Sequence, residues 1–304
     1  MLAQVVHSGL DRFAMAYEDQ WRRVPQGFHP GPAGPLDPFS ELGPLPSPPP
    51  RSGRWTAPSP WPFQGDRLTL HAEPSRGRRR GTAILVPPWK IPSRALLRGW
   101  VRLLARAGLD AWLYVPPFHL ERTAPGARSG EGFVSPDLGR FREALSQMVL
   151  ELRLCAALAA GEGEVALVGL SLGALGAAWA ATGPERVDRA ALVAAPADVT
   201  AVFQGTPIGA RYARLAARAG TPLPPPAELA GWLRPLAPLE RRPTARHVFV
   251  AGGAHDAIAL RGPETLARSW GVPWHAYSRG HMTLLFACRA LRRDVGGFLV
   301  ASRG

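Results

Sequence analysis

Ser171 lies in the pentapeptide Gly169-Leu-Ser-Leu-Gly173, which is the clearest sign of chemistry in the sequence. The pattern Gly-x-Ser-x-Gly is informative when a strand precedes it and a helix follows it. The apolar run 165–168 predicts a buried strand, and the alanine-rich stretch after the pentapeptide predicts a helix. In that turn a serine points out at the edge of a sheet, where a helix N-terminus favours an oxyanion. We therefore predict Ser171 as a nucleophile.

A serine hydroxyl needs a base to take its proton, and the base needs an acid to orient it. His281 follows the last predicted strand and precedes the last predicted helix. Asp256 follows the predicted strand 247–251 across two glycines, which allow a tight turn. Asp198, which follows the preceding strand, is the alternative acid. The sequence thus predicts His281 as the base and Asp256 as the acid.

The motifs Gly169–Gly173, Gly253–Asp256 and Gly280-His281 resemble those of the α/β-hydrolase superfamily, and the order Ser, Asp, His is the order of that fold. The resemblance covers roughly Asp66 to the C-terminus. Residues 116–131 are also similar to a poorly characterised bacterial branch of the superfamily. The resemblance implies a hydrolase that cleaves a carboxylic ester or thioester through an acyl-enzyme. The alternative is a catalytically silent descendant that binds an apolar ligand or a protein partner.

An oxyanion hole needs two backbone N–H donors, and one is expected at Leu172, directly after the nucleophile. The other should come from the turn after the predicted strand 82–86. The two prolines that open this turn have no N–H, so Trp89 or Lys90 must provide it. This sequence departs here from the His-Gly that many members of the superfamily carry, so the resemblance does not extend to this turn. Lys90 is alternatively a residue that binds a substrate anion.

Phe118, His119 and Trp232 are expected to bind substrate at the rim of a pocket at the carboxyl ends of the strands. The aromatic rim predicts an apolar acyl group. No pair of histidines or cysteines has the spacing of metal ligands, so neither a metal nor another cofactor is expected. Cys155 and Cys288 fall on apolar stripes of predicted helices and are expected in the core.

From residue 64 onward strands alternate with helices, which predicts an α/β domain (64–304) with a doubly wound, mostly parallel sheet. Residues 1–63 form a separate region. Apolar positions at helical spacing predict a helix over 2–21, and the 13 prolines of 25–62 predict a proline-rich arm that is neither a regular helix nor a central strand. Residues 197–245 interrupt the alternation and predict an inserted lid, with a long surface connection as the alternative.

The formal net charge of +13 comes almost entirely from arginine, since Lys90 is the only lysine. The densest basic run, Arg76–Arg80, is predicted in a solvated turn. We expect a small-molecule ester as the partner and no nucleic acid. Contact with an anionic membrane surface is an alternative that is not favoured, and the helix over 2–21 makes a homodimer possible. The sequence shows neither a secretory signal nor a membrane span, so a cytoplasmic location is expected.

Overall fold

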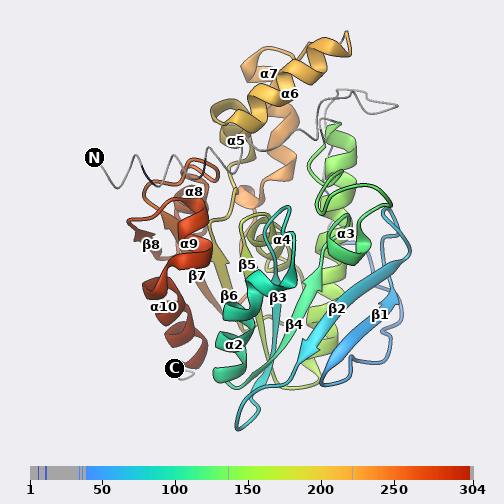
Figure 1. Ribbon diagram of the computed structural model, residues 1–304, viewed down its shortest axis with the longest axis vertical. Helices are drawn as coiled ribbons and strands as arrows, with labels where there is room; N and C mark the ends of the chain where they lie inside the picture. The colour runs from blue at the N-terminus through green and yellow to red at the C-terminus, as the bar shows by residue number, and fades with distance from the viewer. Residues whose placement is uncertain are drawn as a thin grey trace.

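An eight-stranded sheet runs through the centre of the molecule (Figure 1). The computed structural model describes Val6, Asp11, Gly34, Leu36 and residues 39–301 except Pro136 and Thr221. Strand order is β1-β2-β4-β3-β5-β6-β7-β8. The pairs β1–β2 and β2–β4 are antiparallel and all other pairs are parallel, which confirms the predicted mostly parallel sheet. The strands are β1 (Gly53–Pro58), β2 (Arg67–Glu73), β3 (Gly81–Val86), β4 (Leu109–Val115), β5 (Glu164–Leu170), β6 (Arg189–Val193), β7 (His247–Gly253) and β8 (Trp274–Tyr277).

Strand β3 is the point at which the order of the parallel strands reverses, because β4 lies on one side of it and β5 on the other. In open α/β sheets, ligands bind in the crevice beyond the carboxyl ends of the strands at such a switch point. The chain leaves the carboxyl ends of β3 and β5 at Val86 and Leu170. The residues that follow these two strands are therefore placed to form a site.

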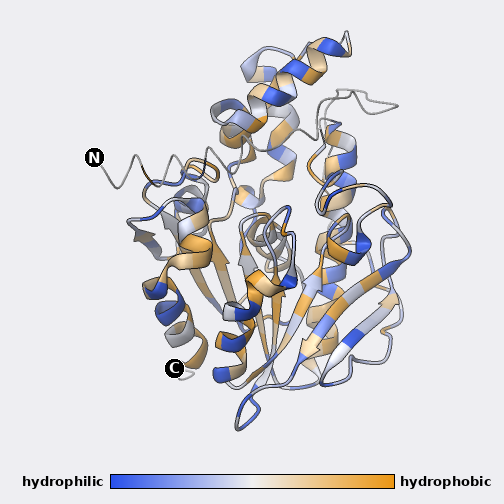
Figure 2. Cartoon of the chain, viewed as in Figure 1, coloured by the Kyte–Doolittle hydropathy of each residue, from blue (hydrophilic) through white to orange (hydrophobic). Residues whose placement is uncertain are grey.

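Helices cover both faces of the sheet, as a doubly wound fold requires (Figure 1). Side chains of α3 and α4 belong to one apolar cluster, together with those of α8, and side chains of α2, α9 and α10 belong to a second cluster. Both clusters include side chains of the central strands, which Figure 2 shows as predominantly hydrophobic. The helices are α2 (Arg98–Arg106), α3 (Leu138–Ala160), α4 (Leu172–Ala180), α8 (Gly262–Trp270), α9 (His281–Ala287) and α10 (Arg289–Val300).

The region expected as an insertion contains three helices that lie beyond the top of the sheet in Figure 1: α5 (Val199–Gly205), α6 (Pro207–Arg218) and α7 (Pro226–Leu233). Thr206 separates α5 from α6, and its hydroxyl accepts a hydrogen bond from the Ile208 N–H. The ring of Phe203 in α5 packs edge-on against Tyr212 in α6, with centroids 5.2 Å apart. The segment is therefore a small helical unit with its own packing.

The predicted final helix differs from the structure, and β1 and α3 have features that their sequences explain. Strand β1, at the edge of the sheet, lies within the predicted proline-rich arm, and its proline comes at its last residue, where an edge strand tolerates one. Helix α3 begins after Asp137, because the Asp137 carboxylate accepts the Arg140 N–H. The predicted final helix is two helices, because Cys288 is extended and its sulfur caps α10 by accepting the Leu291 N–H.

Helix 2–21 falls outside the described residues except at Val6 and Asp11, both of which are helical. Both cysteines are free and buried. Within the described part of the chain, no helix combines the length and the apolar character needed to cross a membrane.

Candidate active site

Ser171 occupies the sharp turn between β5 and α4, with φ of 54° and ψ of −119°. A non-glycine residue in this region is strained by about 1–3 kcal/mol, so its surroundings must hold it there. Its N–H donates to the Val193 carbonyl at 2.8 Å. A Cβ at Gly169 would lie 2.5 Å from the Ala174 Cα, and one at Gly173 would overlap the Val86 carbonyl oxygen. Gly169 thus lets β5 approach the first turn of α4, and Gly173 lets that turn pack against the end of β3.

Ser171, His281 and Asp256 form one hydrogen-bonded chain. The Ser171 Oγ lies 2.8 Å from Nε2 of His281, and the Nδ1 of His281 lies 2.7 Å from Oδ2 of Asp256. All three side chains are buried. Because a carboxylate only accepts hydrogen bonds, Nδ1 carries the proton and Nε2 is left to accept from the serine hydroxyl. The sequence placed these three residues in separate turns, and the structure brings them together.

Asp256 is held by the backbone that follows it. Its second oxygen, Oδ1, accepts the N–H groups of Ile258 and Ala259, each at 2.8 Å. A Cβ at Gly253 would overlap the carbonyl oxygen of Arg279, so the glycine lets the turn after β7 approach the turn before α9. Asp198, the alternative acid, instead caps α5 by accepting the Ala201 N–H at 2.9 Å.

Asp11 reaches this site from the N-terminal region, and the sequence offered no sign of it. Its Oδ2 accepts the N–H of His281 at 2.8 Å and that of Ala257 at 3.2 Å. Its Oδ1 accepts the N–H of Met282 at 3.0 Å. The side chain is fully buried. The signal that could have found it is weak: it is an acidic residue on a predicted amphipathic helix.

Two carboxylates act on the charge of His281. Burial alone lowers the pKa of the imidazole, but the charge of Asp256, its hydrogen bond and the charge of Asp11 outweigh burial, so the pKa lies above its ordinary value. The protonated form of His281 is therefore stabilised by its surroundings.

The turn after β3 contains the candidate second donor for an oxyanion. Lys90, with φ of 58°, directs its N–H to Nε2 of His119 at 3.2 Å. The Trp89 indole donates to the Gly130 carbonyl at 2.8 Å. Leu172 is the first residue of α4, directly after Ser171. Because the Lys90 N–H points to His119, Trp89 is the better candidate to pair with Leu172.

His119 is fully buried beneath this turn, not at a pocket rim. Its Nδ1–H donates to the Pro117 carbonyl at 2.8 Å, which leaves Nε2 to accept from Lys90. Burial, together with the charge of Arg122, lowers the pKa of His119 to about 4 despite the bond to Pro117. The imidazole is therefore neutral at pH 7 and orders the turn that carries Trp89.

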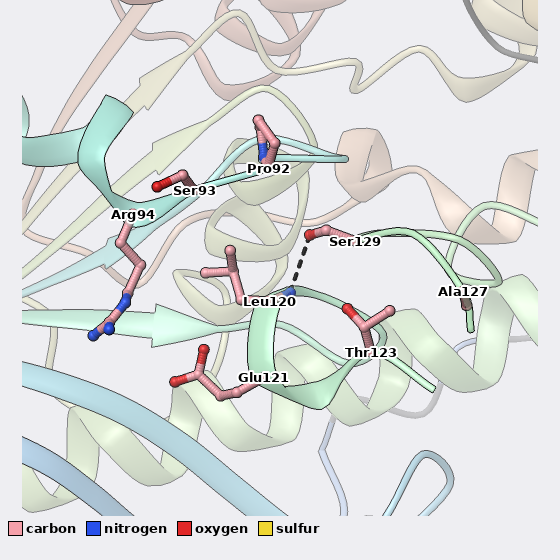
Figure 3. Close-up of a pocket in the computed structure, with 8 residues that line it drawn as sticks. All are labelled: Pro92, Ser93, Arg94, Leu120, Glu121, Thr123, Ala127 and Ser129. Atoms are coloured by element: carbon pink, nitrogen blue, oxygen red, sulfur yellow. Dashed lines mark hydrogen bonds between the residues drawn. The ribbon is translucent and has the colours of Figure 1, made fainter. Parts of the chain in front are cut away.

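The loop after His119 is tied to the same turn. Ser129 donates to the Ile91 carbonyl at 2.7 Å and accepts the Leu120 N–H at 3.0 Å, the bond drawn in Figure 3. A shallow hollow of about 410 Å³ lies here. It is lined by Pro92, Ser93, Arg94, Leu120, Glu121, Thr123, Ala127 and Ser129. None of these residues belongs to the Ser171 site.

Phe118 and Trp232, both predicted to bind substrate, pack in the main apolar cluster. Phe118 is 7% exposed and its ring lies edge-on to Phe63, with centroids 6.2 Å apart. Trp232 is partly buried against the same cluster.

Other apolar side chains join the helical insertion to the site. Val202 of α5 and Ile208 of α6 are buried together, and Trp89 and Ile258 pack against them. Trp89 belongs to the turn after β3, and Ile258 lies two residues after Asp256. The insertion thus contacts the loops on two sides of Ser171. A cavity of about 730 Å³ adjoins this contact. Its lining is Gln204, Gly205, Thr206, Pro207, Ala210, Arg211, Arg214, Ala257 and Leu260.

No protein-family model matches the sequence, and no curated protein matches it either. Solved structures do match. An esterase of Pyrococcus furiosus is 16% identical with a TM-score of 0.52, over 82% of this chain and 91% of that one. The proline iminopeptidase of Mycobacterium smegmatis is 17% identical with a TM-score of 0.52, over 81% and 97%. An acetyl xylan esterase from Paenibacillus is 13% identical with a TM-score of 0.53, over 79% and 81%.

At these identities the likeness concerns the fold, and the names of the three proteins describe two esterases and one peptidase. The strand order of the sheet agrees with that likeness, as does the position of Ser171 between β5 and α4. This chain has the α/β-hydrolase fold, as its sequence motifs implied.

Proposed function

We propose that the protein is a serine hydrolase that cleaves a carboxylic ester or thioester through an acyl-enzyme. The observation that carries this proposal is the hydrogen-bonded chain from Ser171 through His281 to Asp256, with links of 2.8 and 2.7 Å. It lies at the carboxyl end of β5, beside the switch point of the sheet. Nucleophile, base and orienting acid are within the reach that such chemistry needs.

The proposed reaction begins when the Ser171 Oγ attacks the carbonyl carbon of the ester while its proton passes to Nε2 of His281. The negative charge that develops on the carbonyl oxygen is stabilised by the N–H groups of Leu172 and Trp89. The protonated His281 then gives its proton to the leaving alcohol or thiol, and the C–O or C–S bond breaks. Water, deprotonated by His281, releases the acid and restores Ser171.

The proposed substrate has an apolar acyl group of short to medium length. Val202 and Ile208 form an apolar contact with Trp89 and Ile258, which supports an apolar environment beside the nucleophile. The sequence suggested the same acyl preference from Phe118, His119 and Trp232. The proposal now rests on this contact. A buried methylene contributes about 0.8 kcal/mol, or roughly fourfold in kcat/KM when it is fully used in the transition state.

A fluorophosphonate probe followed by p-nitrophenyl esters of two to twelve carbons tests the proposal. We expect an adduct on the Ser171 peptide, no turnover by Ser171→Ala, and a kcat/KM that climbs from acetyl to butyryl or hexanoyl and then falls. An active protein with its adduct elsewhere would refute the mechanism. A profile that is flat or highest for acetyl would refute the acyl preference alone. Absence of both adduct and turnover would favour the silent, ligand-binding alternative.

A further inference from the structure

Asp11 is separated by 270 positions from His281, yet one of its carboxylate oxygens touches both loops of the site. Oδ2 accepts the N–H of Ala257, the residue after Asp256, and the N–H of His281 itself. A single atom therefore bridges the segment that carries the acid and the segment that carries the base.

We propose that Asp11 is a positioning residue of this site, which fixes the main chain of His281 against the turn of Asp256 and adds a second negative charge beside the base. The inference rests on the hydrolase function proposed above. It makes a part of the N-terminal region a component of the active site.

Position is the first consequence of the Asp11 contacts. The bonds to His281 and Met282 fix the first turn of α9, and thus the direction in which the imidazole leaves the main chain. The bond from the Ala257 N–H joins Oδ2, which also accepts the His281 N–H, to the loop that carries Asp256. Small displacements matter here, because a misplacement of about 1 Å between reacting groups costs up to roughly a hundredfold in rate.

Charge is the second consequence. In the reaction His281 gains a proton while buried, and a nearby anion favours that state. Among the described residues, the carboxylates that act on His281 are those of Asp256 and Asp11. Nearby, the His255 ring contacts the Ser278 hydroxyl at 3.2 Å and the Arg279 guanidinium donates to the Ser278 carbonyl at 2.9 Å.

A simple helix cap is the competing interpretation of Asp11. A cap contributes about 1 kcal/mol to stability and has no reason to change the titration of a histidine. The two interpretations therefore differ in the pH dependence of the enzyme, and not in its melting temperature. Asp188 offers a control away from the site, because it is also buried and accepts a backbone N–H, that of Val165 at 2.9 Å, while its ion pairs are with Arg186 and Arg246. Val165 lies at the opposite end of β5 from Ser171.

The experiment compares the full-length wild type with Asp11→Asn, Asp11→Ser and Asp188→Asn. It measures kcat and kcat/KM for an ester from pH 5 to 9, the titration of the His281 imidazole by NMR, and thermal unfolding. In both Asp11 variants we expect the pKa on the acid side of the kcat/KM profile to fall by about half a unit to one unit. We also expect kcat at the plateau to fall roughly tenfold. Asp188→Asn should lower the melting temperature and leave the profile where it is.

A profile and plateau unchanged in a folded Asp11→Asn variant would overturn the proposal. Failure of both neutral variants to fold would overturn it too, because Asp11 would then support the whole fold and not the site. If the wild type neither reacts with the fluorophosphonate nor turns over any ester, the hydrolase function fails. The NMR titration then decides about Asp11 separately: an imidazole pKa that is the same in Asp11→Asn and wild type refutes it.

Discussion

Buried carboxylates at the two ends of the sheet have different partners. At the amino ends of the parallel strands they face arginines. Glu164, the first residue of β5, accepts from Arg189 at 2.6 Å and from Arg80 at 2.7 Å. At the carboxyl ends, Asp256 faces a histidine and backbone N–H groups, and Asp11 accepts backbone N–H groups of the described part of the chain.

The difference lies in whether the positive partner can lose its proton. An arginine remains charged at any pH a protein meets, so Arg189 beside Glu164 cannot take up a proton during a reaction. An imidazole titrates near neutrality, so the pair of Asp256 with His281 has two states that the protein can exchange during a reaction. The same residue type is thus structural at one end of the sheet and placed for proton transfer at the other.

The largest expected effect distinguishes the carboxylates at the two ends of the sheet by their influence on kcat. Asp256→Asn should lower kcat by about 10³–10⁴, because the imidazole loses the group that fixes its tautomer and stabilises its charge. Glu164→Gln should leave kcat per folded molecule within about twofold. It should lower the unfolding free energy by about 3–5 kcal/mol, because the buried Arg189 loses its carboxylate partner. Initial rates and urea unfolding of both variants measure this. A Glu164→Gln variant as inactive as Asp256→Asn would abolish the distinction.

The dependence of kcat/KM on pH should report the ionisation of His281 at the carboxyl ends of the strands. The base must be neutral to accept the serine proton, and the pKa of His281 is raised, so kcat/KM should be lost as pH falls through that raised pKa. Below it the loss should approach tenfold per pH unit, as for one ionising group. Stopped or continuous ester assays from pH 5 to 9 measure this. A flat profile from pH 5 to 8 in an active enzyme would show that His281 is not the base.

His119 sharpens the comparison because it is a buried histidine whose described bonds go to the backbone. Its pKa is lowered to about 4, so the unfolded chain binds a proton between pH 6.5 and 4 that the folded chain does not. The unfolding free energy should therefore decrease as the pH is lowered from 6.5 to 4, and His119 should account for about 3 kcal/mol of that decrease. In His119→Gln, which retains polar side-chain atoms, the pH dependence should be smaller by that amount. Urea unfolding of both proteins at pH 7 and pH 4.5 measures this difference. If the unfolding free energy changes equally with pH in the wild type and in His119→Gln, the prediction is refuted.

The smallest effect concerns the apolar contact at the carboxyl ends, where no charge changes. Val202→Ala should lower the ratio of kcat/KM for hexanoyl over acetyl esters by roughly fourfold to fifteenfold, since about two carbons of apolar contact are lost. Val187→Ala, a buried valine before β6 at the amino end of the sheet, should leave the ratio unchanged. An unchanged ratio in Val202→Ala would mean that the contact serves packing only.

The sequence was most informative where the chain must make a short turn. Ser171, Asp256 and His281 could be placed because glycines and strand ends mark their turns locally, and their hydrogen bonds agree with that placement. Asp11 could not be found, because a contact across 270 positions leaves no pattern at either end. The position of His119 was equally hidden, since it depends on positive φ at Lys90, a position where the sequence has no glycine or asparagine to announce it.

The unusual position of Lys90 makes the site accessible to amine chemistry. Its Nζ lies 4.3 Å from the centre of the Trp89 ring, in the turn that contains the proposed second oxyanion donor. The sequence contains no other lysine, so the chain has one ε-amine, and that amine is at this turn. An amine-directed fluorophore or cross-linker would therefore modify one side chain, beside the nucleophile, in addition to the α-amine of the chain. Every molecule that couples to a solid support through its ε-amine would be fixed by its reactive face.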